Sequence, residues 1–125
     1  MKSIILVGIG GFAGSVVRYL VGIALINKPP LYNFPLGTLI VNALGSLFFG
    51  LTMAFLLKHN MEGSFWNLLI LTGFCGGFTT FSTFTFENFN YLQQGQLMHF
   101  IGYSLASFII ALAMIAIGFK VGKII

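Results

Sequence analysis

Four long apolar segments, joined by short polar ones, make up almost the whole chain. They cover roughly residues 3–26, 35–57, 65–89 and 100–119 of the 125. A helix needs about 20 apolar residues to cross the roughly 30 Å of hydrocarbon in a bilayer, so each segment is long enough to span it. The pattern predicts an all-α membrane protein with four transmembrane helices, built as a single domain over residues 1–125.

The third segment departs from the rows of Leu, Ile and Val expected of a membrane helix. Residues 73–85 read Gly-Phe-Cys-Gly-Gly-Phe-Thr-Thr-Phe-Ser-Thr-Phe-Thr, a mixture of glycines, hydroxyls and regularly spaced rings. Glycines weaken a helix. In lipid, broken backbone is tolerated only where it is buried in protein or lines a wet path. We therefore expect the third helix to be broken near its middle, beside a site for an ion or a substrate.

The second segment carries a small and polar stripe at helical spacing. Its members are Thr38, Asn42, Gly45, Ser46 and Phe49. Residues three and four apart share one face of a helix, so this face differs from the Leu, Ile and Val around it. We expect it to turn toward other helices or a polar path rather than toward lipid.

The first segment contains pairs of small residues four apart, Gly10 with Gly14 and Gly11 with Ser15. Such faces let two membrane helices approach closely. Residues 27–30, Asn-Lys-Pro-Pro, then break the chain before the second helix. Pro35 suits the start of that helix, where its missing N–H has no partner to lose.

The composition agrees with a membrane protein. Hydrophobic residues make up 58% and charged residues 6% of the chain, against about 25% charged in soluble domains. The net charge of +4 is scattered over chain ends and loops. It suits anionic lipid headgroups better than nucleic acid. With four spans both chain ends share one side, and the lysines on that side mildly favour one orientation.

Two polar side chains lie well inside spans. Arg18 is a functional candidate because intramembrane charges usually are, but a long side chain can also snorkel to the interface. Asn42 is either an interhelical hydrogen-bonding residue or a neutral donor lining a pore. Thr38 and Ser46 on the same stripe favour the pore. There a neutral donor binds an anion without trapping it.

The residues around the predicted break leave further alternatives. Phe81 and Phe84 are core residues if taken alone, yet beside a broken backbone their positive ring edges suit an anion. If the helix opens near Thr79 and Thr80, the carbonyls there lose their helical hydrogen bonds. Their new partners are either a monovalent cation or nearby hydroxyls and water. Glu87, near the end of the span, is interpreted as an interfacial carboxylate in water.

Three stretches of sequence resemble the CrcB/Fluc family of fluoride channels, and the resemblance extends over essentially the whole chain. They are residues 10–19 (Gly-Gly-Phe-Ala-Gly-Ser-Val-Val-Arg-Tyr), 37–45 (Gly-Thr-Leu-Ile-Val-Asn-Ala-Leu-Gly) and 73–84, which ends in Thr-Thr-Phe-Ser-Thr-Phe. The resemblance implies a four-helix subunit that forms an antiparallel, dual-topology dimer with two pores. It also implies passive, selective export of fluoride across the cell inner (plasma) membrane. The partner chain is an identical copy or a paralogue.

The resemblance also implies roles for individual residues. Asn42 would be the pore amide, and Phe81 and Phe84 the rings that coordinate fluoride. The backbone carbonyls of Gly76 and Thr79 from both subunits would hold a structural Na⁺ at the dimer centre.

The remaining roles concern the polar path of the pore. It would comprise Thr83 and Ser107, with Tyr103 beside them, Thr38 on the stripe of Asn42, and Arg18 close to a vestibule. Ala111 departs from relatives that carry a further hydroxyl in the fourth span, so the path there is less defined.

Two other functions compete with a channel. A small multidrug-type transporter also has four short spans, but its proton exchange needs an embedded carboxylate, and the chain offers only Glu62 in a loop and Glu87 near a span end. A purely structural membrane subunit explains the glycines but not the clustered Thr, Ser and Asn. The chain shows no nucleophile–base pair and no phosphate loop, which makes an enzyme the least suitable class.

Overall fold

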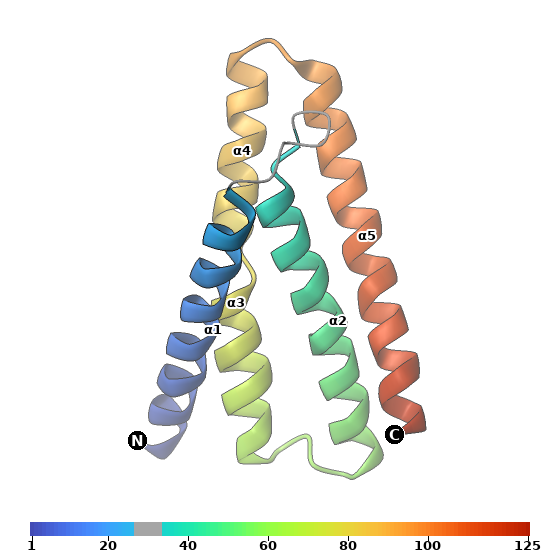
Figure 1. Cartoon of the computed structure of the whole chain (residues 1–125). Helices are drawn as coiled ribbons and strands as arrows, with labels where there is room; N and C mark the ends of the chain where they lie inside the picture. Colours follow the sequence, from blue (N-terminus) through green and yellow to red (C-terminus); the bar gives the residue numbers. More distant parts are fainter. Residues whose placement is uncertain (27–33) are drawn as a thin grey trace.

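Helices form nearly all of the computed structural model, which describes residues 1–26 and 34–125. The elements are α1 (Lys2–Ile26), α2 (Leu36–Lys58), η2 (Asn67–Cys75), α3 (Gly76–Phe78), α4 (Phe81–Gln93) and α5 (Leu97–Ile124), shown in Figure 1. Among these described residues, four stretches are long and apolar enough to cross a membrane: Lys2–Leu25, Leu36–Lys58, Asn67–Gln93 and Leu97–Ile124. The four predicted spans are confirmed, and the protein is a multi-pass membrane protein. The breaker at residues 27–30 lies outside the described residues.

Two of the spans are longer than their apolar patterns suggested. The third continues to Gln93 rather than ending at residue 89, and the fourth begins at Leu97 rather than at residue 100. The turn between them is short, because Gly95 adopts a left-handed φ of 69° that glycine accepts without strain. The Gln96 N–H then donates to the Tyr91 carbonyl and closes the turn. The polar residues on either side of this turn therefore remain helical.

The third span passes through η2, α3 and α4, with its break between the last two. Thr79 has ψ 159° and Thr80 has φ −146°, which are both extended conformations. The backbone of these two residues leaves the helix near the middle of the span, as predicted. Figure 1 shows this short non-helical connection between α3 and α4.

The part of the third span before the break packs closely on α1. A Cβ placed on Gly10 or Gly14 would collide with backbone atoms of Leu69 or Phe74, and one on Gly77 would collide with the Gly11 carbonyl oxygen. The two helices therefore approach backbone to backbone, as the small-residue pairs of the first segment predicted.

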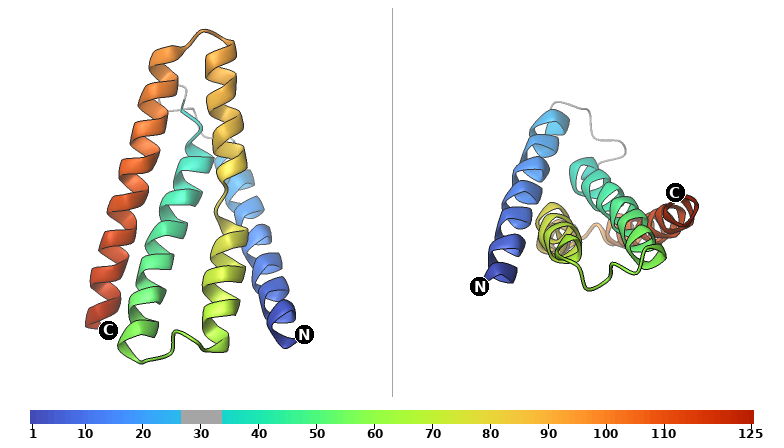
Figure 2. Two further views of the ribbon diagram at one scale, coloured as in Figure 1. Left: turned by 180° about the vertical axis from the view of Figure 1, so that it is seen from behind. Right: turned by 90° about the horizontal axis from the view of Figure 1, so that it is seen from below.

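The second helix packs along α5 in a similar way (Figures 1 and 2). A Cβ on Gly50 would meet the Ile115 carbonyl oxygen, and one on Gly118 would meet the Leu47 carbonyl oxygen. The chain thus contains two tightly packed helix pairs. Both chain ends and the connection between α2 and η2 lie at one end of the bundle, and the α4–α5 turn lies at the other.

Candidate functional site

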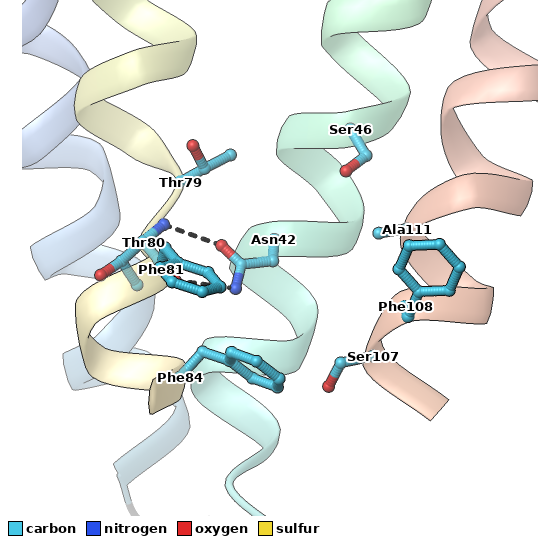
Figure 3. A pocket seen from close by; sticks show the side chains of 9 residues that line it. All are labelled: Asn42, Ser46, Thr79, Thr80, Phe81, Phe84, Ser107, Phe108 and Ala111. Atoms are coloured by element: carbon cyan, nitrogen blue, oxygen red, sulfur yellow. Dashed lines mark hydrogen bonds between the residues drawn. The ribbon is translucent and has the colours of Figure 1, made fainter. Parts of the chain in front are cut away.

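The extended backbone at the break is held by the side chain of Asn42 from α2. Its Nδ2 donates to the Thr80 carbonyl oxygen at 3.0 Å, and its Oδ1 accepts from the Thr80 N–H at 2.8 Å. Figure 3 shows the amide turned toward Thr80. In an unbroken helix the Thr80 N–H would instead donate to the Gly76 carbonyl. Asn42 therefore replaces the helical partners that the break removes.

Two side chains of α1 meet carbonyls on the first side of the break. Arg18 donates from Nη1 to the Thr79 carbonyl oxygen at 3.1 Å, and the Ser15 hydroxyl lies 3.5 Å from the Gly77 carbonyl oxygen. The guanidinium group of Arg18 thus turns toward the break instead of snorkelling away from it. It brings a positive charge to carbonyls that the end of a helix leaves without donors.

The first turn of α4 is capped by hydroxyls of the same motif. The Thr80 Oγ1 accepts the Thr83 N–H at 3.3 Å and donates to the Thr83 Oγ1 at 3.0 Å. The Ser82 hydroxyl lies 3.4 Å from Thr80 Oγ1. The Thr80 hydroxyl helps a new helix begin inside the membrane, because it accepts from a backbone N–H that would otherwise lack a partner.

A pocket of about 320 Å³ opens between the break, α2 and α5. Its lining comprises Asn42, Ser46, Thr79, Thr80, Phe81, Phe84, Ser107, Phe108 and Ala111 (Figure 3). All of these described lining residues are uncharged. The wall therefore combines an amide, hydroxyls and aromatic rings, and the buried hydroxyl of Ser107 is part of it.

The two phenylalanines of the motif lie side by side at this pocket. The ring centroids of Phe81 and Phe84 are 6.0 Å apart with an angle of 38° between the rings. Phe81 is 79% exposed in the single subunit, so it is not a core residue. This exposure does not agree with the alternative that places Phe81 in the core, and the role of the two rings toward an anion stays a prediction.

A second cavity, of about 380 Å³, contains the other polar candidates. Its lining includes Arg18, Thr38 and Thr83, and it shares Thr80 with the first pocket. The structure therefore divides the predicted pore residues into two groups. Asn42, Phe81, Phe84 and Ser107 line the first pocket, and the residues beside the arginine line the second.

Glu87 is not the water-exposed carboxylate that its position near the span end suggested. Its Oε1 accepts from the Thr38 hydroxyl at 2.6 Å, and its Oε2 accepts from the Tyr103 hydroxyl at 2.7 Å. Tyr103 is fully buried at 0% exposure and lies outside the lining of both cavities, with its ring centroid 5.3 Å from that of Phe84. The carboxylate joins α4 to α2 and α5 at the same time.

The two residues predicted to hold Na⁺ line a third cavity, of about 300 Å³. A Cβ on Gly76 would meet nothing within 4 Å, so this face of the third span is open in the single subunit. The Thr79 carbonyl is the one that accepts from Arg18. Each carbonyl oxygen has a second lone pair, and backbone carbonyls are suitable ligands for a monovalent cation. The carbonyl oxygens of Gly76 and Thr79 are therefore of a chemical type that can bind the predicted Na⁺.

Comparison with known proteins identifies relatives of the whole chain. A family model described as "CrcB-like protein, Camphor Resistance (CrcB)" matches residues 5–119. A protein of Azobacteroides pseudotrichonymphae named "Fluoride-specific ion channel FluC" is 42% identical over 119 residues, which cover 95% of this chain and 94% of the relative.

Two further relatives carry similar names. The "Fluoride-specific ion channel FluC" of Nitratidesulfovibrio vulgaris is 38% identical over 126 residues, which cover the full length of both proteins. The "Fluoride-specific ion channel FluC 1" of Yersinia pestis is 42% identical over 118 residues, covering 94% of this chain and 91% of the relative. The similarity extends over all four spans.

Proposed function

Because the chain belongs to the CrcB family, we propose that it is a fluoride-selective channel that exports fluoride passively across the cell inner membrane. The relatives are named as ion channels, which places the chain in a family of channels and not of enzymes. The proposal rests on this kinship and on one observation of the site. That observation is the uncharged pocket of amide, hydroxyl and ring groups beside the helix break.

The pocket offers fluoride weak partners instead of a fixed positive charge. A conducting site must bind its ion well enough to admit it and weakly enough to release it. The Asn42 amide has two N–H donors, of which Thr80 takes one. The second is left for an anion, which the positive ring edges of Phe81 and Phe84 approach from the side. The Ser107 hydroxyl completes the wall opposite.

The second cavity serves as a vestibule in this proposal. Arg18 supplies the charge that draws anions from water, and the hydroxyls of Thr38 and Thr83 line the way inward. Because Arg18 is also bound to the Thr79 carbonyl, its charge is partly compensated, which lowers the risk of trapping an anion there. Tyr103 supports the path from behind Phe84 without lining either cavity.

We further propose that the functional unit is an antiparallel dimer with two pores and a central Na⁺. Gly76 leaves an open face at bilayer depth, and lipid cannot satisfy backbone carbonyls there. A second copy related by a twofold axis in the membrane plane would bring the Gly76 and Thr79 carbonyls of both chains together. Such a symmetric contact closes on itself, and the bound cation would hold the carbonyls at the two breaks together.

Ion efflux from liposomes that contain only the purified protein tests the channel. Liposomes loaded with potassium fluoride should release fluoride once valinomycin removes the voltage limit, and matched liposomes loaded with chloride should not. Protein-free liposomes give the background. Equal release of chloride, or release that requires a proton gradient, would contradict a passive fluoride channel.

The orientation of the chain tests the antiparallel dimer. We expect a thiol reagent that cannot cross membranes to label an Ile125→Cys variant from both sides of the membrane in intact cells and inverted vesicles. The unaltered chain is the control, since its own Cys75 is buried. Labelling from the cytoplasmic side alone would exclude a dual-topology homodimer and leave an inverted paralogue as the partner.

A further inference from the structure

A polar link between α4 and α5 lies one helical turn from the fluoride pocket and outside its lining. The Ser104 hydroxyl of α5 donates to Asn88 Oδ1 of α4 at 3.0 Å. The Nδ2 of the same amide donates at 3.0 Å to the carbonyl oxygen of Phe84, whose ring lines the pocket. Asn88 is only 5% exposed, so the link is buried.

The positions of these residues tie the link to the pocket wall. Asn88 follows Phe84 by four residues on α4, and Ser104 precedes Ser107 by three on α5. Residues at these spacings share a face of their helix one turn apart. The two linked residues therefore stand next to the two wall residues on facing helices. A change in the distance between Asn88 and Ser104 would therefore move Phe84 relative to Ser107.

Besides this link, α4 meets α5 through ring contacts of Tyr103 with Phe84 and Tyr91, of Tyr91 with His99, and through one further hydrogen bond. The α4 helix packs less extensively on α5 than α2 does, and the backbone collisions that lock the glycine-rich helix pairs have no counterpart between α4 and α5 in the described residues. The neighbouring contact from Tyr103 to Glu87 ties the same helices, but it ends on a carboxylate shared with α2. Among the described residues, the amide of Asn88 bonds to α4 and α5 alone.

We propose that Asn88 and Ser104 are positioning residues for the fluoride path. They hold the ring of Phe84 at its working distance from Ser107 without contacting the ion. The inference rests on the proposed function, because it concerns the width of the pocket through which fluoride passes. Removing the link lets α4 move against α5, so each open pore conducts less well even though the protein still assembles.

The test measures the current of a single open channel in a planar bilayer, together with the fraction of liposomes that hold an active channel. Ser104→Ala should lower the single-channel fluoride current about three- to tenfold, the range that one interhelical hydrogen bond supplies. The active fraction should stay at the wild-type value. Ser104→Thr keeps the hydroxyl and should restore most of the current.

Two further variants complete the design. Asn88→Leu should lower the current as much as Ser104→Ala, and the double variant should be no worse than either, because both remove the same link. Thr85→Val is the matched control, since within the described part of the chain the Thr85 hydroxyl bonds inside its own helix, to the Phe81 carbonyl. It should leave the current unchanged.

The outcomes separate this inference from the proposed function. If the unaltered protein carries no fluoride, the channel proposal fails and this inference fails with it. If the unaltered protein conducts and Ser104→Ala conducts equally well, only the positioning role is overturned. A lower active fraction with an unchanged single-channel current would make the link purely structural. Should Asn88→Leu fail to assemble, the small change Ser104→Ala still decides the question.

Discussion

The two parts of the third span are held in place by different physical means. Before the break, η2 and α3 lie against α1 at backbone distance, and an added Cβ at Gly73 would meet the Gly10 Cα at 2.9 Å. After the break, α4 is held by side chains. Glu87 and Asn88 accept hydrogen bonds from hydroxyl groups of neighbouring helices. One half is fixed by shape and the other by hydrogen bonds.

This difference follows from the solvent. Lipid gives apolar helices no hydrophobic reason to associate, so close packing and interhelical hydrogen bonds are the forces available. Close packing of backbones leaves no room for an ion. Side-chain hydrogen bonds span a wider gap and leave polar groups at the edges of a cavity. The packed half therefore serves as the anchor, and the hydrogen-bonded half forms the wall of the pocket.

The two regimes meet at Thr79 and Thr80. Arg18 holds the last carbonyl of the packed half, and Asn42 holds the first residue of the other half. The substitutions that test this comparison change the backbone-packed half, the hydrogen-bonded half, or the junction between them. If the comparison is correct, changes to the anchor alter stability, and changes to the wall alter transport.

The largest effect is expected from Gly77→Ala in the anchor. The new Cβ would collide with the Gly11 carbonyl oxygen, and overpacking of this kind costs about 1–3 kcal/mol. Thermal unfolding of the purified protein and its yield as a single species in detergent measure the loss. Gly8→Ala is the control, because nothing lies within 4 Å of its Cβ. Equal stability of the two variants would mean that α1 is not locked by backbone contact.

The second-largest effect is expected from Asn42→Asp, which disrupts the contact of residue 42 with Thr80 at the junction. The carboxylate keeps an acceptor for the Thr80 N–H, loses the donor to the Thr80 carbonyl, and places a negative charge on the anion path. The negative charge repels a passing anion, so we expect fluoride flux to fall about tenfold or more while the protein still assembles. Asn90→Asp, near the α4–α5 turn, is the control. Wild-type flux would mean that the amide only joins helices.

Phe81→Ile and Phe84→Ile alter the wall. Both substitutions keep apolar bulk and remove the ring edge, whose geometry contributes about 0.5–1.5 kcal/mol. Liposome flux should fall about three- to tenfold in each variant, with unfolding temperature little changed. Phe86→Ile is matched, since this exposed ring of α4 lies outside the pocket lining. Unchanged flux in both pocket variants would reduce the rings to packing.

The sequence predicted the features that depend on local pattern. Bilayer thickness fixes the length of a span, so four helices could be counted from hydropathy. Glycines and hydroxyls in the third span indicated the break, and spacing placed Thr38 and Asn42 on one face. The partners of that face were not predictable, because a stripe defines a direction and not a distance. The contact of Asn42 with Thr80 joins residues 38 apart in sequence.

The interpretation of Glu87 failed for the same reason. Its place near a span end suggested water, but its hydroxyl partners lie 49 and 16 residues away. The link of Asn88 to Ser104 was missed as well. The four-residue spacing of Asn88 from Phe84 was the available signal, and it acquires meaning only when α5 is known to lie opposite.

The smallest effect is expected from Tyr103→Phe, which tests how far the hydrogen-bonded half depends on Glu87. The ring stays beside Phe84 and only the hydroxyl is lost, so the cost should be close to the average of about 0.6 kcal/mol for an interhelical hydrogen bond in a membrane. Tyr19→Phe on the exposed face of α1 is the control, and thermal unfolding is the measurement. Thr38→Val removes the other donor, from the side of α2. Combined with Tyr103→Phe it leaves a half-buried carboxylate without either hydroxyl, and an uncompensated buried charge costs more than one lost bond. The double variant should therefore lose more stability than the two single variants together. Strictly additive losses would show that each hydroxyl acts alone, and no loss at all would return Glu87 to the water-exposed role that its sequence position suggested.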